Sequence, residues 1–325
     1  MKPDNPPHYT PHPALEAFLA KANAVMEARR ARGDEHTPVT MRENLDLMTR
    51  GFVSAPAEVE QVIDTMVTGS PGDYPVPVRI YHPAPDEARP VIVFAHGGGH
   101  MAGSVSVYDG IARRLARASG HVLVSVEYRL APECPYPAGL EDLISVYTGV
   151  YATLERRHVA HQRSLTVMGD SGGAAITASA VHRLATDPAA NPAVNIARQV
   201  LIYPSLDYSC AQASMHDLGS GYLLELERIQ WLFDHYLPPG TDRAAVSPLF
   251  MDIPPRYPRT LVIGAGLDPL RDEGGAYVER LRAAGQDAEL ELFTDMIHAF
   301  LNLEDLVPEA CQRCYTRIAD FLNKP

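Results

Sequence analysis

Short apolar runs alternate with longer helix-compatible stretches over most of the chain. An uninterrupted apolar run is typical of a strand covered on both faces, and apolar residues at helical spacing are typical of a packed helix. The runs that predict buried strands are residues 91–95, 121–126, 164–168, 197–203, 262–265 and 289–293. The stretches that predict helices between and after them are residues 108–118, 138–154, 174–185, 271–284 and 306–322. This alternation predicts a mostly parallel sheet with helices on both faces, the α/β class.

The N-terminal part does not follow this alternation of strands and helices. Residues 59–67 and 76–81 alternate apolar and polar positions around the turn Ser70-Pro71-Gly72-Asp73, which predicts an antiparallel pair at the sheet edge and brings the sheet to eight strands. The apolar face of a preceding helix over 14–32 consists of Leu15, Phe18, Leu19, Ala22, Val25 and Met26. With a second helix over 40–50, this segment is too short for its own core. We therefore expect residues 1–55 to form a helical cap segment and residues 56–325 to form the main α/β domain.

A second departure follows Tyr203-Pro204, where about forty residues contain no expected strand. Residues 224–236 in this excursion favour a helix, which carries the single tryptophan, Trp231. An excursion of this length inside a compact domain is usually a lid or a binding element. We expect a cap insertion at about residues 205–245, over the same end of the sheet as the N-terminal helices.

The stretch Gly169-Asp170-Ser171-Gly172-Gly173 joins a predicted strand to a predicted helix. This is the G-x-S-x-G pattern of a nucleophile elbow, in which a strained turn projects the serine hydroxyl. Glycine is needed two residues before and two after, where side chains would collide. The pattern alone is weak, because a strand-to-helix turn can contain serine by chance. Its interpretation depends on partners elsewhere in the chain.

An activated serine needs a base, and the base needs an orienting acid. Asp268 and His298 each follow a predicted strand, and the carboxyl ends of parallel strands are where ligand sites form. Their order after Ser171 is that of α/β hydrolases. Asp272 and Asp295 are the nearby alternatives to Asp268, but we expect Asp272 on the helix and Asp295 in the same loop as His298. Ser171, Asp268 and His298 are therefore the predicted catalytic residues.

The glycines after His96 supply the remaining part of the site. Without Cβ atoms, they allow the backbone to turn its amides inward. We expect the amides of Gly98, Gly99 and Gly172 to bind the oxyanion. A phosphate-binding loop would instead need G-x-G-x-x-G or a Walker lysine, and neither is present in the sequence. His100 and Asp170, which adjoin the glycines and the serine, are candidates for the substrate pocket.

Composition limits the partners. The chain has 325 residues and a formal charge of −12, a balance that repels nucleic acid and anionic lipid. The first thirty residues contain no apolar core of signal-peptide length, and no stretch approaches the length of a membrane span, so we expect no membrane association and a cytoplasmic protein. Cys311 and Cys314 form a C-x-x-C, but no second pair completes a zinc site. We expect them one turn apart on the last helix, with no metal and no cofactor.

These motifs together resemble a known family. The matching pieces are His96-Gly97-Gly98-Gly99, Glu127-Tyr128-Arg129-Leu130-Ala131-Pro132-Glu133, Gly169-Asp170-Ser171-Gly172-Gly173, Leu201-Ile202-Tyr203-Pro204, Asp268-Pro269-Leu270-Arg271-Asp272-Glu273 and His298-Ala299-Phe300. In this order and spacing the chain resembles the hormone-sensitive-lipase-like family of α/β-hydrolase esterases, and within it the bacterial acetyl-esterase-like members. The resemblance implies an α/β-hydrolase fold, hydrolysis of short-chain carboxylic esters, an N-terminal cap and no cofactor.

The chain departs from the family pattern at three positions. Gly172 stands where the family mostly has alanine, which preserves the amide. His100 stands where a large aromatic residue is usual, which places a polar ring at the pocket wall. Glu127 often corresponds to aspartate, and we interpret it as structural.

Three functions stay open at this stage. The first is a serine carboxylesterase acting on a small-molecule ester. The second is a hydrolase of a lactone, carbamate or amide, and the third is a catalytically inactive receptor on the same scaffold. An intact base at His298 favours an enzyme over a receptor. The sequence leaves the oligomeric state open, with a homodimer as one assembly that it permits.

Overall fold

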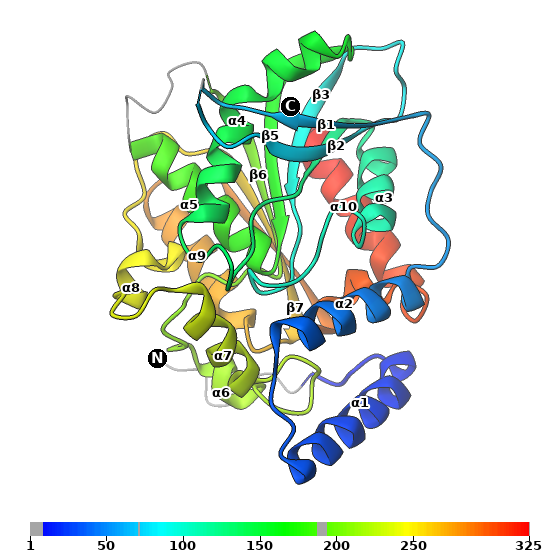
Figure 1. Cartoon of the computed structure of the whole chain (residues 1–325), viewed down its shortest axis with the longest axis vertical. Coiled ribbons are helices and arrows are strands. Elements are labelled where there is room, and N and C mark those ends of the chain that lie inside the picture. The colour runs from blue at the N-terminus through cyan, green and yellow to red at the C-terminus, as the bar shows by residue number, and fades with distance from the viewer. Residues whose placement is uncertain (1–8, 71, 187–193, 325) are drawn as a thin grey trace.

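The computed structural model describes residues 9–70, 72–186 and 194–324, and its centre is one eight-stranded sheet (Figure 1). The strand order is β1-β2-β4-β3-β5-β6-β7-β8, in which β2 runs antiparallel to β1 and β4 and all other neighbours are parallel. The strands are β1 Gln61–Val67, β2 Val76–His82, β3 Arg89–Ala95, β4 Val122–Val126, β5 His161–Asp170, β6 Ile196–Ile202, β7 Arg259–Leu267 and β8 Ala288–Ile297. The predicted α/β class and eight-stranded, mostly parallel sheet are confirmed.

Helices cover both faces of the sheet (Figure 1). The α-helices are α1 Pro13–Arg32, α2 Pro38–Phe52, α3 Asp109–Ser119, α4 Ala138–Arg156, α5 Gly172–Thr186, α6 Ala213–Asp217, α7 Leu226–Tyr236, α8 Arg243–Val246, α9 Arg271–Ala283 and α10 Pro308–Asn323. Two short 3-10 turns, η1 Pro248–Phe250 and η2 Phe300–Leu303, complete the elements of the described residues. α3 and α10 pack on one face, and α4, α5 and α9 pack on the other.

Successive side chains of a strand point to opposite faces of the sheet, so each strand contributes to two cores. In β3, Ile92 and Phe94 join a core that includes residues of α3 and α10. The alternate residues Val91 and Val93 join a second core with residues of α4 and α5. A strand covered in this way must be apolar at every position, which is why its sequence shows no alternation.

The N-terminal helices and the excursion after β6 meet at one end of the sheet. α1, α2, α6 and α7 lie together there, at the bottom of Figure 1. Asn23 Nδ2 on α1 donates to the Gly221 carbonyl at 3.1 Å, and Arg30 on the same helix pairs with Glu225. The expected apolar face of α1 is only partly buried, because Leu15 and Leu19 are enclosed whereas Val25 is 53% exposed.

The main differences from the predicted elements lie at strand ends. β8 continues to Ile297, since its pairing with β7 resumes after an irregularity and joins Leu267 to Ile297. Asp295 was expected in a loop with His298 and is instead part of this strand. The expectation was wrong because continued pairing depends on β7, which lies far away in the sequence.

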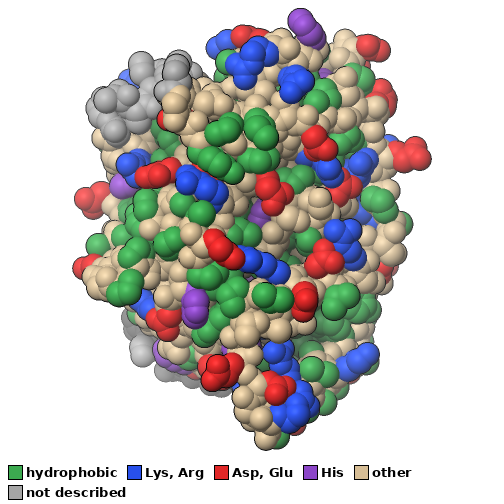
Figure 2. All heavy atoms as spheres, in the orientation of Figure 1, with side chains coloured by type: hydrophobic (Ala, Val, Ile, Leu, Met, Phe, Trp, Pro, Cys, Tyr) green, Lys and Arg blue, Asp and Glu red, His purple; other side chains and the backbone are tan. Residues whose placement is uncertain are grey.

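The surface carries charges of both signs. On the face in Figure 2, acidic and basic side chains are interspersed among apolar ones. Within the described ranges, no helix is both long and apolar enough to cross a bilayer.

Close backbone contact fixes the junction between β5 and α5. A Cβ added to Gly173 would lie 2.2 Å from the Ala95 carbonyl oxygen at the end of β3. A Cβ added to Gly169 would lie 2.5 Å from the Gly173 carbonyl carbon. Only glycine permits α5 to begin this close to the sheet.

This contact predicts opposite effects for two helical glycines. Gly173→Ala should lower the free energy of unfolding by roughly 2–3 kcal/mol, because backbone atoms cannot move aside for the methyl group. Gly275→Ala on α9 is the matched control, since a Cβ there meets nothing within 4 Å. It should raise stability by about 0.5–1 kcal/mol through helix propensity. Urea unfolding of both variants checks this, and equal effects would contradict the close approach.

Candidate active site

Ser171 occupies the turn between β5 and α5. Its φ of 52° lies in the left-handed region, which is strained for a residue with a side chain. The Ser171 amide donates to the Ile202 carbonyl at 2.9 Å, and its carbonyl accepts from Ser205 at 3.3 Å. These bonds to the end of β6 hold the turn so that the hydroxyl projects at the N-terminus of α5.

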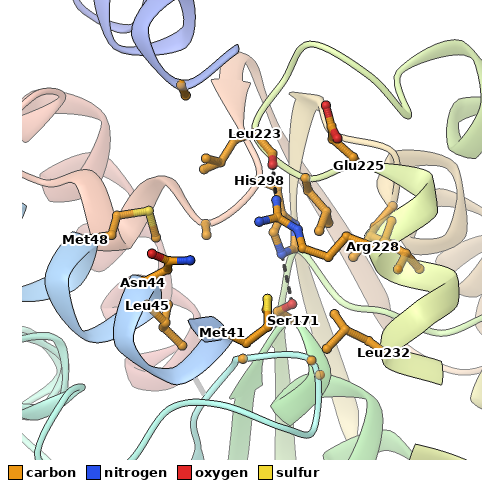
Figure 3. Close-up of a pocket in the computed structure, with 18 of the residues that line it drawn as sticks. Met41, Asn44, Leu45, Met48, Ser171, Leu223, Glu225, Arg228, Leu232 and His298 are labelled. Carbon is orange, nitrogen blue, oxygen red and sulfur yellow. Dashed lines mark hydrogen bonds between the residues drawn. The ribbon is translucent and has the colours of Figure 1, made fainter. Parts of the chain in front are cut away.

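The structure brings the three predicted catalytic side chains together from three strand ends. Ser171 Oγ lies 2.9 Å from His298 Nε2, and His298 Nδ1 lies 2.8 Å from Asp268 Oδ2 (Figure 3). His298 is 6% exposed and Asp268 is 1% exposed. The other carboxylate oxygen of Asp268 accepts the Leu270 amide at 2.9 Å. This geometry allows His298 to take the serine proton while Asp268 orients the imidazole.

The neighbouring carboxylates make other contacts. Asp272 lies on α9, as expected, where it accepts the Ser214 amide and pairs with Arg271. Asp295, in strand β8, accepts the His12 amide through its backbone carbonyl. The described contacts therefore leave Asp268 as the acid bonded to His298.

The loop after His96 lies against the start of α5. Gly98 and Gly99 have φ values of 122° and 62°, which favour glycine. A Cβ on Gly172 would lie 3.2 Å from the Gly99 nitrogen and 3.0 Å from the His100 nitrogen. The amides of Gly98, Gly99 and Gly172, the predicted oxyanion donors, thus belong to two segments that meet beside Ser171. The close approach also gives a reason for glycine at 172, where the family usually has alanine.

Asp170 is joined to this loop. Its Oδ1 accepts the Gly97 amide at 2.6 Å, and its Oδ2 accepts the Tyr108 hydroxyl at 3.2 Å. These two hydrogen bonds lower the pKa of Asp170, but burial has the larger effect and raises it to about 7. Asp170 is among the residues that line the cavity, and its bonds also position the glycine loop.

His100 forms part of the cavity wall. Its ring stacks on Tyr236 with centroids 3.7 Å apart, and its Nε2 lies 3.4 Å from the Tyr208 hydroxyl. Burial lowers the pKa of His100 to about 3, so the ring is neutral at pH 7. A neutral imidazole within an aromatic cluster thus occupies the position where the family usually has a large aromatic side chain, and it adds no charge.

A cavity of about 410 Å³ opens over Ser171 and His298. It is lined by residues of α1, α2 and α7 as well as the glycine loop, and Figure 3 labels Met41, Asn44, Leu45, Met48, Leu223, Glu225, Arg228 and Leu232 among them. None of these eight was predicted from the sequence. They belong to α2, α7 and the segment just before α7, whose position over the sheet no local motif specifies.

The C-x-x-C motif lies away from this site. Cys311 and Cys314 are buried one turn apart on α10, as expected, and both are free thiols. Cys311 Sγ donates to the Phe300 carbonyl at 3.4 Å, and burial raises the pKa of both thiols. Across the residues that the structure describes, no group of three or more His, Cys, Asp or Glu residues is arranged to hold a metal ion.

Known proteins share both the sequence and the fold. A family described by its alpha/beta hydrolase fold matches residues 92–302. Ethyl acetate hydrolase of Pseudomonas putida is 32% identical over 259 residues, which cover 78% of this chain and 80% of that protein. Esterase LipI of Mycobacterium tuberculosis is 32% identical over 311 residues, 92% of each chain. The solved structure of an esterase from Pyrobaculum calidifontis superimposes with a TM-score of 0.82 at 29% identity, over 96% of this chain and 98% of that one.

The fold and the arrangement of Ser171, His298 and Asp268 define an α/β hydrolase. Within that class, the chain belongs to the hormone-sensitive-lipase-like esterase family, so the predicted resemblance is confirmed.

The raised pKa of Asp170 predicts a pH-dependent contribution to stability. Between its unfolded value of 3.8 and its folded value of about 7, the folded protein keeps a proton that the unfolded chain loses. Stability should therefore fall as pH rises through this window, by on the order of 4 kcal/mol for this group. Asp170→Asn removes the titration.

Urea unfolding of the wild type and Asp170→Asn from about pH 4.5 to about 7.5 measures the effect as a difference. The wild type should lose stability relative to the variant over this range. A difference that stays constant, or rises with pH, would contradict a neutral Asp170 in the folded state.

Proposed function

We propose that this chain is a serine carboxylesterase that hydrolyses short-chain acyl esters through an acyl-enzyme intermediate. The observation that carries the proposal is the pair of hydrogen bonds that link Asp268 to His298 and His298 to Ser171. Relatives named as an ethyl acetate hydrolase and an esterase support the same class of reaction. The substrate is a small-molecule ester.

The first half of the reaction forms the acyl-enzyme. His298 Nε2 removes the proton of Ser171 Oγ, which attacks the ester carbonyl carbon. The carbonyl oxygen becomes an oxyanion, stabilised by the amides of Gly98, Gly99 and Gly172 and by the dipole of α5. As the tetrahedral intermediate collapses, His298 gives its proton to the departing alcohol.

The second half repeats these steps with water. His298 removes a proton from water, which attacks the acyl carbon, and Ser171 leaves with that proton. Asp268 remains ionised and stabilises the imidazolium in both halves. Side chains and backbone amides of this chain supply every group that these steps use.

We further propose that residues 1–55 and about 205–245 act as a cap over the catalytic domain of residues 56–325. The support is that α1, α2 and α7 contribute to the lining of the cavity over Ser171. In this proposal the cap sets the size of ester admitted and excludes bulk water during acyl transfer. Location in the cytoplasm and pairing into a homodimer stay predictions from the sequence.

Replacement of the nucleophile tests the mechanism. Ser171→Ala should lower kcat on 4-nitrophenyl acetate by roughly 10⁴-fold or more, because no acyl-enzyme forms. Ser54→Ala is the matched control, since Ser54 is exposed and its backbone amide, which the substitution keeps, donates to Asp305. Steady-state kinetics on purified protein measure both. Wild-type turnover by Ser171→Ala would rule out the proposed nucleophile.

Leu232 on α7 tests the role of the cap in acyl selection. A Cβ on Gly99 would lie 2.6 Å from Leu232 Cδ1, so this side chain covers the glycine loop. Leu232→Ala should raise the kcat/KM ratio of 4-nitrophenyl octanoate to 4-nitrophenyl acetate by about tenfold, because it opens space beside the reacting carbonyl. Leu226→Ala, on the same helix but outside the cavity lining, should leave this ratio unchanged. Equal ratios in both variants would show that α7 does not limit the acyl chain.

A further inference from the structure

The cavity over Ser171 is mostly apolar but contains charged groups. Its apolar lining includes Phe18, Met26, Met48, Phe52, Leu223 and Phe233. The charged side chains among the described lining residues are Lys21, Arg29, Asp170, Glu225 and Arg228. Charges beside a reacting ester act strongly, since an apolar enclosure screens them weakly.

Both carboxylates of this lining already have hydrogen-bond or ion-pair partners. Glu225 Oε2 lies 2.5 Å from Arg30 on α1, and its side chain is only 6% exposed. Asp170 accepts the Gly97 amide and the Tyr108 hydroxyl, and burial raises its pKa to about 7. Neither group balances a further cation in the cavity by direct pairing.

Lys21, Arg29 and Arg228 all lack an ion pair among the described residues, and of the three only Arg228 has a donor that is buried without a hydrogen-bond partner. Arg228 extends from α7 into the cavity, on the side where His298 and Ser171 lie (Figure 3). One terminal nitrogen donates to the Leu223 carbonyl, whereas Nε is buried without a hydrogen-bond partner in the described part of the chain. Glu225 acts on Arg228 through its charge, yet the two form no ion pair among the described residues.

A partly buried guanidinium without a counter-ion is costly. Burial lowers the pKa of Arg228, but arginine stays protonated in proteins, so the charge persists at pH 7. Desolvation of an unpaired charge opposes folding unless an anion completes the site. The planar guanidinium matches the two oxygens of a carboxylate.

We propose that Arg228 binds an anionic group of the substrate, so that the natural substrate is an ester that also carries a carboxylate. The inference rests on the proposed esterase function and names its substrate class. An apolar body of the ester would pack against the lining of α1 and α2, while its carboxylate meets Arg228 and its carbonyl meets Ser171. The cavity size agrees, because about 410 Å³ falls within the range of roughly 300–1,000 Å³ typical of pockets for drug-sized ligands. An acetate-sized ester would leave most of it unfilled.

The test compares paired esters that differ by one negative charge. On the acyl side, the mono-4-nitrophenyl ester of adipic acid is paired with 4-nitrophenyl hexanoate. On the alcohol side, 4-acetoxybenzoate is paired with its methyl ester. For each pair, the ratio of kcat/KM for the anionic ester to kcat/KM for the neutral ester is measured in the wild type, Arg228→Gln and Arg228→Lys. The ratio within each variant cancels differences in folding and in active fraction.

Arg228→Gln should lower this ratio by about tenfold or more for at least one pair, since it removes a charge-assisted contact from an apolar enclosure. Arg228→Lys should restore part of the ratio, because it keeps the charge but not the fork. Lys21→Gln is the matched control, as it removes the same charge from an exposed position of the lining, where water screens it. It should change the ratio by less than about twofold.

Two outcomes would overturn the inference. If Arg228→Gln leaves both ratios at their wild-type values, Arg228 serves only to hold the Leu223 carbonyl. If Arg228→Gln and Lys21→Gln lower the ratio equally, the preference reflects general attraction of anions and not a binding contact. Hydrolysis of the neutral esters by the wild type in either case leaves the proposed esterase function intact.

A binding measurement separates the two proposals further. The probes are 4-acetamidobenzoate and its methyl ester, titrated by calorimetry into Ser171→Ala and into Ser171→Ala/Arg228→Gln. The carboxylate should bind the first variant more tightly than its methyl ester does, and the advantage should disappear in the second. Failure of the wild type to hydrolyse any ester, with this advantage present, would refute the esterase and keep the anion site.

Discussion

The close backbone packing at the end of β5 is the constraint on which the site depends. Gly173, in the first turn of α5, packs against the last carbonyl of β3, and Ser171 just before the helix has a left-handed φ. The same packing places the glycine loop that follows β3 beside Gly172. The nucleophile and the predicted oxyanion donors therefore share one rigid junction. A Cβ at Gly173 would collide with backbone atoms at the end of β3, so this position requires glycine.

Burial determines the charge state around this junction. Asp170, enclosed beneath the glycine loop, has a pKa raised to about 7, and the neighbouring His100 is neutral. The Asp268–His298 pair lies beside the serine, and the guanidinium of Arg228 lines the same cavity. A few fixed charges in an otherwise apolar enclosure give orientation to a substrate that packs mainly through apolar contacts.

The sequence supported good predictions where the chemistry is local. The elbow pattern around Ser171 indicates its own turn, because Gly169 and Gly173, on the two sides of the serine, approach each other too closely for a Cβ. Uninterrupted apolar runs revealed the buried strands, since coverage of both faces removes alternation. The order of Asp268 and His298 after Ser171 was also enough to predict them as catalytic residues, because the carboxyl ends of parallel strands lie at one edge of the sheet. The roles of these residues in catalysis stay proposals.

The sequence by itself thus determined the class of fold, the strands and the three side chains that meet at the sheet edge. Only the tertiary structure decided how far β8 extends past Asp295, how His100 stacks on Tyr236, and which residues of α1, α2 and α7 enclose the serine. The difference is physical. A strained turn or a buried strand is fixed by neighbours in the chain, whereas the burial of Arg228 depends on helices that pack together from distant parts of it.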